Sequence, residues 1–60
     1  MKKIVVLGAG ESGTGAAILA KNKGMDVFVS DMGEIAPMYQ ALLDQHHIKW
    51  EAGTHTPELI

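Results

Sequence analysis

Residues 3–13 read KIVVLGAGESG and residues 26–31 read DVFVSD, and these two stretches decide the fold. Each contains a short apolar run rich in β-branched residues that ends in glycine or in polar residues. This pattern is typical of a strand buried on both faces of a parallel sheet. We therefore expect a first strand over residues 3–8 and a second strand over residues 26–31.

The segment between these strands has the pattern of a helix. Small residues recur at helical spacing from Gly13, the last turn is polar and cationic, and Gly24 follows as a stop signal. A helix over residues 13–23 is expected, with its inner face made by the small residues Gly13, Ala16, Ala17 and Ala20.

A second helix is expected from Pro37 to about His46, because proline suits the first turn of a helix. Its inner face is predicted from i, i+3, i+4 and i+7 spacing and comprises Met38, Ala41, Leu42 and Gln45, together with Ile35. Ile48 and Trp50 then alternate with polar residues, which indicates a short strand near a sheet edge, ended by Gly53. Thr56, Pro57 and Glu58 carry the signals that open another helix.

The order of elements is therefore β-α-β-α-β followed by the start of a helix. This order predicts an α/β fold, the N-terminal part of a Rossmann-like doubly wound parallel sheet, with its first three strands in the order 3-2-1. Because the chain stops one turn into a helix, we expect residues 1–60 to be a truncated N-terminal nucleotide-binding domain of a longer protein.

Composition argues against several classes of function. The net charge is −2, so no cationic field is present to attract nucleic acid or anionic lipid. No apolar stretch approaches the ~20 residues that cross a bilayer. The absence of cysteine fits a reducing compartment, and we expect a cytoplasmic protein with no nucleic-acid or membrane partner.

The strongest functional motif is G-x-G-x-x-G, formed by Gly8, Gly10 and Gly13 at the first strand-to-helix junction. The first glycine permits a tight turn, the second lets the backbone approach a phosphate, and the third lets the helix pack on the strand. Free N–H groups at the start of the helix then form a phosphate site that needs no basic side chain. Nucleotide phosphate binding is therefore predicted at this loop.

Asp31 follows Gly13 by eighteen residues and ends the second strand. In such folds a carboxylate at this place accepts hydrogen bonds from a nucleoside sugar or base, which we predict here. Within the loop, Glu11 would repel a phosphate unless its carboxylate points away. The hydroxyl of Ser12 either caps the helix or donates to a phosphate oxygen, and both interpretations stay open.

No metal site is expected, because His46 and His47 are adjacent and point about 100° apart on a helix. His55 lies beyond the third strand, at the same edge of the sheet as Gly10 and Asp31, so a role on the ligand side stays open. No serine has a nearby histidine partner along the chain, so we expect no pair of nucleophile and base in this segment.

Residues 5–21, VVLGAGESGTGAAILAK, and residues 26–31 resemble the MurD family of Mur ligases, particularly its members from Bacteroidetes. The resemblance runs the whole length of the chain. Its most specific features are the serine in G-x-G-x-S-G, the aspartate that ends the second strand, and Gly53-Thr54-His55 before the next helix.

The resemblance implies an ATP-dependent cytoplasmic ligase of peptidoglycan synthesis that joins D-glutamate to UDP-N-acetylmuramoyl-L-alanine through an acyl phosphate. The loop from Gly8 to Gly13 would face the diphosphate through Glu11 and Ser12, and Asp31 with Met32 would lie against the uridine. ATP and magnesium would be bound by other domains of the same parent chain. The segment alone would therefore be neither catalytic nor a binder of these cofactors.

Two alternatives remain open at the level of the residues. The chain could be the N-terminal half of an NAD(P)-dependent oxidoreductase, in which Asp31 would bind the adenosine ribose. It could also be a non-enzymatic regulatory module that senses a nucleotide. Better-known members of the resembled family carry threonine and a basic residue after the aspartate, where this chain has Met32 and Gly33.

Overall fold

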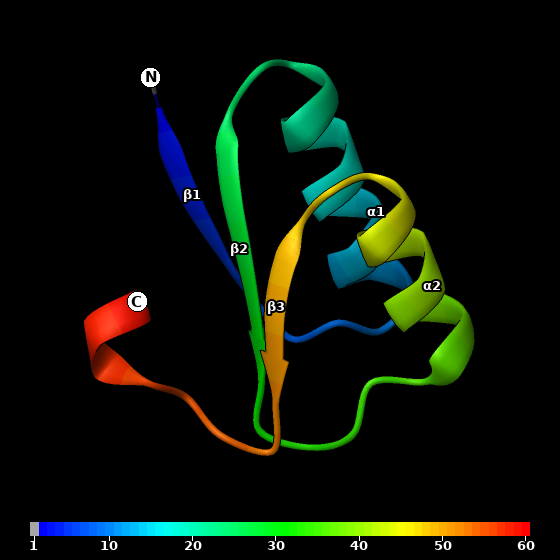
Figure 1. The fold of residues 1–60 in the computed structure, drawn as a ribbon, viewed down its shortest axis with the longest axis vertical. Helices are drawn as coiled ribbons and strands as arrows, with labels where there is room; N and C mark the ends of the chain where they lie inside the picture. The colour runs from blue at the N-terminus through cyan, green and yellow to red at the C-terminus, as the bar shows by residue number, and fades with distance from the viewer. Residues whose placement is uncertain (1) are drawn as a thin grey trace.

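The computed structural model describes residues 2–60, which form a parallel sheet with helices packed on one face (Figure 1). The elements follow the predicted order along the chain. They are β1 (Lys3–Leu7), α1 (Glu11–Asn22), β2 (Asp26–Asp31), α2 (Pro37–Gln45), β3 (Lys49–Ala52) and the 3₁₀ helix η1 (Pro57–Leu59).

The sheet has three strands in the order β1-β2-β3, all parallel, so β2 is central. Val5 pairs with Phe28, and Val29 pairs with Trp50. The predicted fold class and strand order are confirmed. Because the strands are parallel, their carboxyl ends meet at one edge, the lower end of the sheet in Figure 1.

The hydrophobic core lies between the sheet and the two helices, which cover the same face of the sheet in Figure 1. Connections between parallel strands of one sheet are right-handed in nearly all proteins, and two such crossovers in the same direction place both helices on one face. Val27 and Val29 of β2 meet Ala17 of α1 and Leu43 of α2, and each of these side chains is at most 4% exposed. The core therefore depends on the central strand.

Two predictions of inner helix faces need correction. On α2 the buried residue is Leu43, which belongs to a stripe with Tyr39 and Ile35, whereas Met38 is 64% exposed. Ala41 and Gln45 are exposed as well, and Leu42 is only half-buried. Both stripes of α2 contain apolar residues, so periodicity could not choose between them; Ile35, ahead of the helix, is buried in the same cluster as Leu43.

On α1 the buried stripe consists of Thr14, Ala17 and Ala20, and the predicted inner residue Ala16 is exposed. The buried face of α1 therefore includes the polar Thr14 and excludes Ala16. Ile18 is half-buried and packs against the core.

The helix ends agree with the sequence in part. α1 begins at Glu11, two residues before the predicted start, because Gly10 already occupies the N-cap position. Gly24 follows the C-cap with φ of +82°, so its predicted role as the stop is confirmed. At Thr56 the chain forms only the 3₁₀ turn η1, and the Thr56 side chain makes no cap hydrogen bond.

Candidate functional site

The glycine loop between β1 and α1 makes the tight turn that the motif predicts. Gly8 has φ of +102°, a conformation that favours glycine, and its N–H donates to the carbonyl of Ser30 at 2.8 Å. A Cβ atom on Gly13 would lie 1.9 Å from the carbonyl oxygen of Gly8. The predicted duties of the first and third glycines, the turn and the close packing of helix on strand, are confirmed.

Gly10, the second glycine, has a different environment. Its φ of −78° suits any residue, and a Cβ atom built on it would meet nothing within 4 Å among the described residues. The first helical hydrogen bond of α1 runs from Thr14 N–H to the Gly10 carbonyl at 2.9 Å. The N–H groups of residues 11–13 precede this bond, and no acceptor in residues 2–60 receives them.

The peptide groups on both sides of Ala9 are held by side chains. Its N–H donates to Oδ2 of Asp31 at 2.8 Å, and its carbonyl accepts a hydrogen bond from the Thr14 hydroxyl at 3.2 Å. Ala9 and Thr14 are each 2% exposed. Sequence reasoning missed Thr14, although its place three residues before Ala17 on the small-residue stripe was a usable signal.

Asp31 connects the glycine loop to the turn after β2. Its Oδ1 accepts the Gly33 N–H at 2.9 Å, so each carboxylate oxygen holds one backbone donor. The backbone hydrogen bonds from Ala9 and Gly33, with a smaller contribution from His55, lower the pKa of Asp31 below its ordinary value. The side chain is half-exposed, so it can also accept a hydrogen bond from a ligand.

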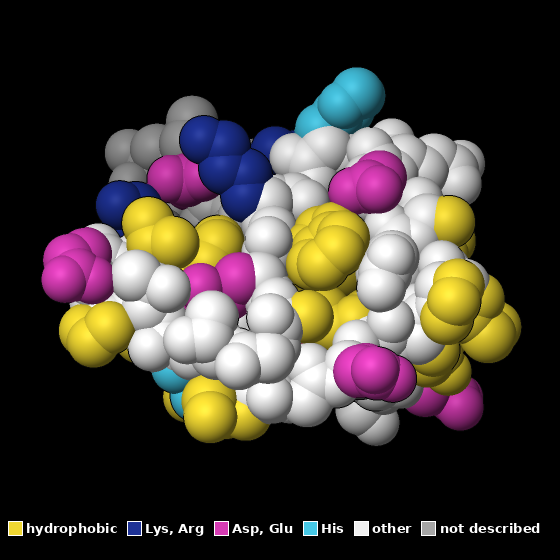
Figure 2. Space-filling model, turned by 60° about the horizontal axis from the view of Figure 1, so that its bottom comes forward, with side chains coloured by type: hydrophobic (Ala, Val, Ile, Leu, Met, Phe, Trp, Pro, Cys, Tyr) yellow, Lys and Arg dark blue, Asp and Glu magenta, His cyan; other side chains and the backbone are white. Residues whose placement is uncertain are grey.

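Glu11 and Ser12 are exposed in the first turn of α1. Because Gly10 occupies the N-cap position, the interpretation of Ser12 as the cap is wrong, whereas its donation to a phosphate stays a prediction. Figure 2 shows the molecule with the lower end of Figure 1 brought forward. In this view the lysine side chains gather at the upper left, away from most of the visible surface. Any phosphate at the loop would depend on backbone donors.

A cavity of about 440 Å³ lies beside Asp31 at the carboxyl edge of the sheet. It is open to solvent and includes the predicted ligand residue Met32, which is 61% exposed. Its other walls come from the loop after β2, the start of α2 and the end of β3: Gly33, Glu34, Ile35, Pro37, Gln40, Ala52 and Gly53. The structure thus places Met32, Asp31 and the glycine loop at one edge of the sheet.

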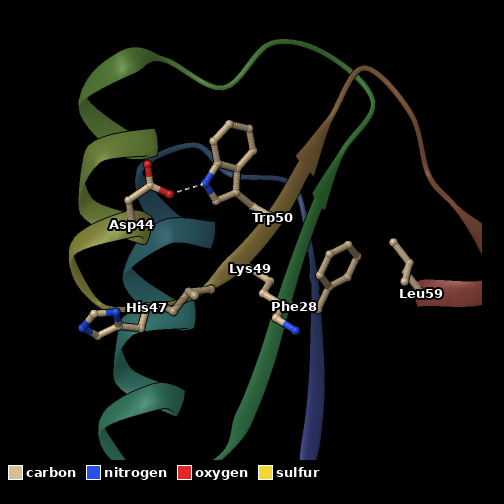
Figure 3. Close-up of a pocket in the computed structure, with 7 residues that line it drawn as sticks. Phe28, Asp44, His47, Lys49, Trp50 and Leu59 are labelled. Atoms are coloured by element: carbon tan, nitrogen blue, oxygen red, sulfur yellow. Dashed lines mark hydrogen bonds between the residues drawn. The ribbon is translucent and has the colours of Figure 1, made fainter.

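A larger hollow, of about 620 Å³, opens at the flank of β3. Figure 3 shows Trp50 and Asp44 on one side of the strands and Phe28 with Leu59 on the other, and the Trp50 indole N–H donates to Asp44 at 2.8 Å. Lys49 and His47 place this hollow at the amino end of β3. Ligands of open α/β sheets bind outside the carboxyl ends of the strands, so the smaller cavity is the better candidate.

His55 lies in a polar cluster with Ser30, Glu51 and Thr56. Ser30 Oγ contacts both Glu51 Oε2, at 2.8 Å, and Nδ1 of His55. A hydroxyl has one hydrogen, so we assign it to the carboxylate, and the ring N–H of His55 then donates to Ser30. The expectation that no serine meets a histidine is wrong, because chain folding brings together residues 25 positions apart.

The hydrogen bonds of this cluster stabilise the segment that follows β3. Ser30 is completely buried, and Glu51 also accepts the N–H and the hydroxyl of Thr56, at 2.8 and 2.6 Å. The two hydrogen bonds from Thr56, with a smaller contribution from the Ser30 hydrogen bond, lower the pKa of Glu51 below its ordinary value. The cluster ties the segment after β3 to the sheet, and the Ser30 hydroxyl faces no solvent where a substrate could reach it.

The other histidines lie where α2 ends. His46 is the C-cap, and His47 follows with φ of +58°, a left-handed conformation that closes the helix. Among residues 2–60 no group of three potential ligands gathers in a way that could hold a metal ion. Within the same residues, no helix has the length and apolar character to span a membrane.

Comparison with known proteins gives the family. Residues 3–60 match the model of the MurD N-terminal domain. No solved structure matches the chain. Among curated relatives, the UDP-N-acetylmuramoylalanine--D-glutamate ligase of Bacteroides thetaiotaomicron is 67% identical over 60 residues, which are 100% of this chain and 14% of that protein.

The ligases of the same name from two other organisms are also similar. The Porphyromonas gingivalis protein is 60% identical over 95% of this chain and 13% of its own length. The Chlorobium phaeobacteroides protein is 34% identical over 98% of this chain and 13% of its own length. The chain thus spans about one seventh of these relatives, and with the family model matching nearly all of its residues, it belongs to the MurD N-terminal domain family.

Proposed function

We propose that this segment binds the UDP end of the substrate in an ATP-dependent ligase that adds D-glutamate to UDP-N-acetylmuramoyl-L-alanine. The parent protein would act in peptidoglycan synthesis in the cytoplasm. The family match and the names of the relatives support this proposal. Residues 1–60 would be the N-terminal UDP-binding part, and the remaining domains of the parent would bind ATP and Mg²⁺.

The observation that carries the proposal is the glycine loop. It leaves the N–H groups of residues 11–13 without acceptors at the positive end of the α1 dipole, and it leaves open space beside Gly10. A diphosphate is a chemically suitable occupant, because these donors need no cationic side chain to bind an anion. Gly8, Gly10 and Gly13 would shape the site, while Glu11 and Ser12 would face the diphosphate through their N–H groups, with the Glu11 carboxylate directed away from it.

The nucleoside would lie next to the loop. Asp31 keeps lone pairs for a sugar or base, and the cavity lined by Met32 offers an open surface for the uridine. His55 contacts the buried Ser30 through Nδ1, so its role on the ligand side would be indirect. None of these residues forms a catalytic group, so the segment alone would bind substrate without turning it over.

Calorimetric titration of the full-length protein with UDP-N-acetylmuramoyl-L-alanine, NAD and ADP in parallel tests the proposal. We expect saturable binding of the UDP substrate and competition by UDP. Lys49→Ala is a matched control, because Lys49 is exposed at the amino end of β3, away from the loop. Binding of NAD in preference to the UDP substrate would favour the oxidoreductase alternative and overturn the proposal.

A nucleotide-sensing module would give a different result. It would bind a nucleotide at the same loop, yet the full-length protein would form no amide from D-glutamate and ATP. A coupled assay for ADP release that requires both D-glutamate and the UDP substrate separates this alternative from the ligase. The names of the relatives lend no support to either alternative.

A further inference from the structure

We propose that Thr14 is a positioning residue for phosphate binding, which orients the Gly10 N–H toward the ligand by holding the Ala9 carbonyl. This inference rests on the proposed function of the glycine loop. It concerns a residue that does not reach the ligand, because Thr14 is buried beneath the loop with 2% of its surface exposed.

The geometry of one peptide group carries the argument. The Ala9 carbonyl and the Gly10 N–H belong to the same planar trans peptide, so the two groups point in opposite directions. The Thr14 hydroxyl donates to that carbonyl at 3.2 Å from the buried side of α1. The Gly10 N–H therefore points away from Thr14, and Gly10 itself is exposed at the surface of the loop.

The preceding peptide, between Gly8 and Ala9, is held by other contacts. Asp31 accepts the Ala9 N–H at 2.8 Å, and the Gly8 carbonyl lies close against Gly13. The Ala9 side chain itself is part of the hydrophobic core. Asp31 therefore holds the Gly8–Ala9 peptide, whereas the side-chain hydrogen bond to the Ala9–Gly10 peptide comes from the Thr14 hydroxyl.

Without that hydroxyl, the Ala9–Gly10 peptide could rotate, because glycine permits many backbone conformations. A rotated peptide would turn a carbonyl oxygen toward the phosphate and remove one donor. Holding the donor in place before the ligand arrives reduces the entropy lost on binding. The expected consequence is a specific loss of affinity for the diphosphate part of the substrate.

The test uses three variants of the full-length protein. Thr14→Val keeps the shape and removes the hydroxyl; Thr14→Ala also removes it and is well tolerated in a helix. Thr14→Ser retains the donor. We expect the first two variants to weaken UDP binding about 3- to 10-fold, the usual contribution of one hydrogen bond, while Thr14→Ser stays near the wild type.

Uridine and UDP as separate probes distinguish positioning from loss of stability. We expect uridine binding, the KM values for ATP and D-glutamate, and kcat to stay unchanged in all three variants. Val27→Ala is the control, because it destabilises the core beneath the central strand without touching the loop, and it should leave UDP affinity unchanged.

The outcomes separate this inference from the proposed function. Wild-type protein that fails to bind UDP would overturn the proposed function and this inference with it. Wild-type binding of UDP together with unchanged UDP affinity in Thr14→Val and Thr14→Ala would overturn the role of Thr14 alone. Equal weakening of uridine and UDP binding would also overturn it, because the effect would not be specific for phosphate.

Discussion

Two junctions at the carboxyl edge of the sheet are held by different chemistry. After β1, the glycine loop depends on backbone contact, with the Gly8 carbonyl touching Gly13 and no room for a side chain. After β3, the segment that leads to η1 is held by the Glu51 carboxylate, which receives three hydrogen bonds from Ser30 and Thr56. The first junction, whose Ala9 N–H also donates to the Asp31 carboxylate, is therefore the one sensitive to volume, and the second depends on the charge of Glu51.

The volume-sensitive junction should give the largest effect. Gly13→Val would place side-chain carbon where the Gly8 carbonyl lies, since even a Cβ atom would be 1.9 Å from that oxygen. Overpacking costs about 1 to 3 kcal/mol and sometimes more, a large share of the ~3 to 5 kcal/mol that a core this small supplies. We expect a strong loss of folded protein, measured by thermal melting with circular dichroism.

Gly15→Val is the matched control for this variant. Gly15 lies in the same helix, and a Cβ atom there would meet nothing within 4 Å. If both variants melt together at the parent's temperature, the tight contact between Gly13 and Gly8 does not exist in solution.

Asp31→Asn should have the next largest effect, and it should act on the loop. Asparagine replaces one carboxylate oxygen with an NH₂ group, which cannot accept the N–H of Ala9 or of Gly33. We expect severalfold weaker binding of the UDP substrate by the full-length protein, measured by calorimetry. Unchanged affinity, with the fold intact by circular dichroism, would remove Asp31 from the site.

Acid should weaken both junctions through their carboxylates. The folded-state pKa values of Asp31 and Glu51 are lowered, so their contributions to stability are fully present above the unfolded-state pKa values. These contributions are lost as the pH falls below about 4 and through the folded-state values. Melting temperatures from pH 6 to pH 3 should decline, and more steeply in the parent than in Glu51→Gln.

An equal acid dependence in Glu51→Gln and in the parent would mean that the Glu51 carboxylate does not hold the segment after β3. Asp26→Asn is a suitable control, because Asp26 is exposed at the amino end of β2. It should leave the acid dependence of the parent unchanged.

Gly10→Ala should have the smallest effect on stability. The backbone at Gly10 suits alanine, the added Cβ meets no described atom, and the change at an N-cap costs a few tenths of a kcal/mol or more. Binding of UDP should nevertheless weaken, because the methyl group occupies the space that the diphosphate would enter. Full affinity in this variant would show that the ligand does not approach Gly10.

The sequence by itself determined the order of the elements, the parallel sheet and the duties of two glycines. Apolar β-branched runs, glycine spacing and helix stop signals are local, so they can be read along the chain. The resemblance carried by residues 5–21 and 26–31 led to the same family that the comparisons show.

Only the tertiary structure decided which helix faces are buried and which side chains meet across the sheet. Met38 and Leu43 are both apolar, yet Leu43 is buried together with Ile35 while Met38 is exposed, and only the packing of α2 on the sheet decides between them. Ser30 and His55, or Ala9 and Asp31, lie more than twenty positions apart and meet because parallel strands bring their carboxyl ends to one edge. Hydrogen bonds between such distant residues leave no periodic signal in a sequence. For this reason the hydrogen bond from Ala9 to Asp31 could be found only in the tertiary structure.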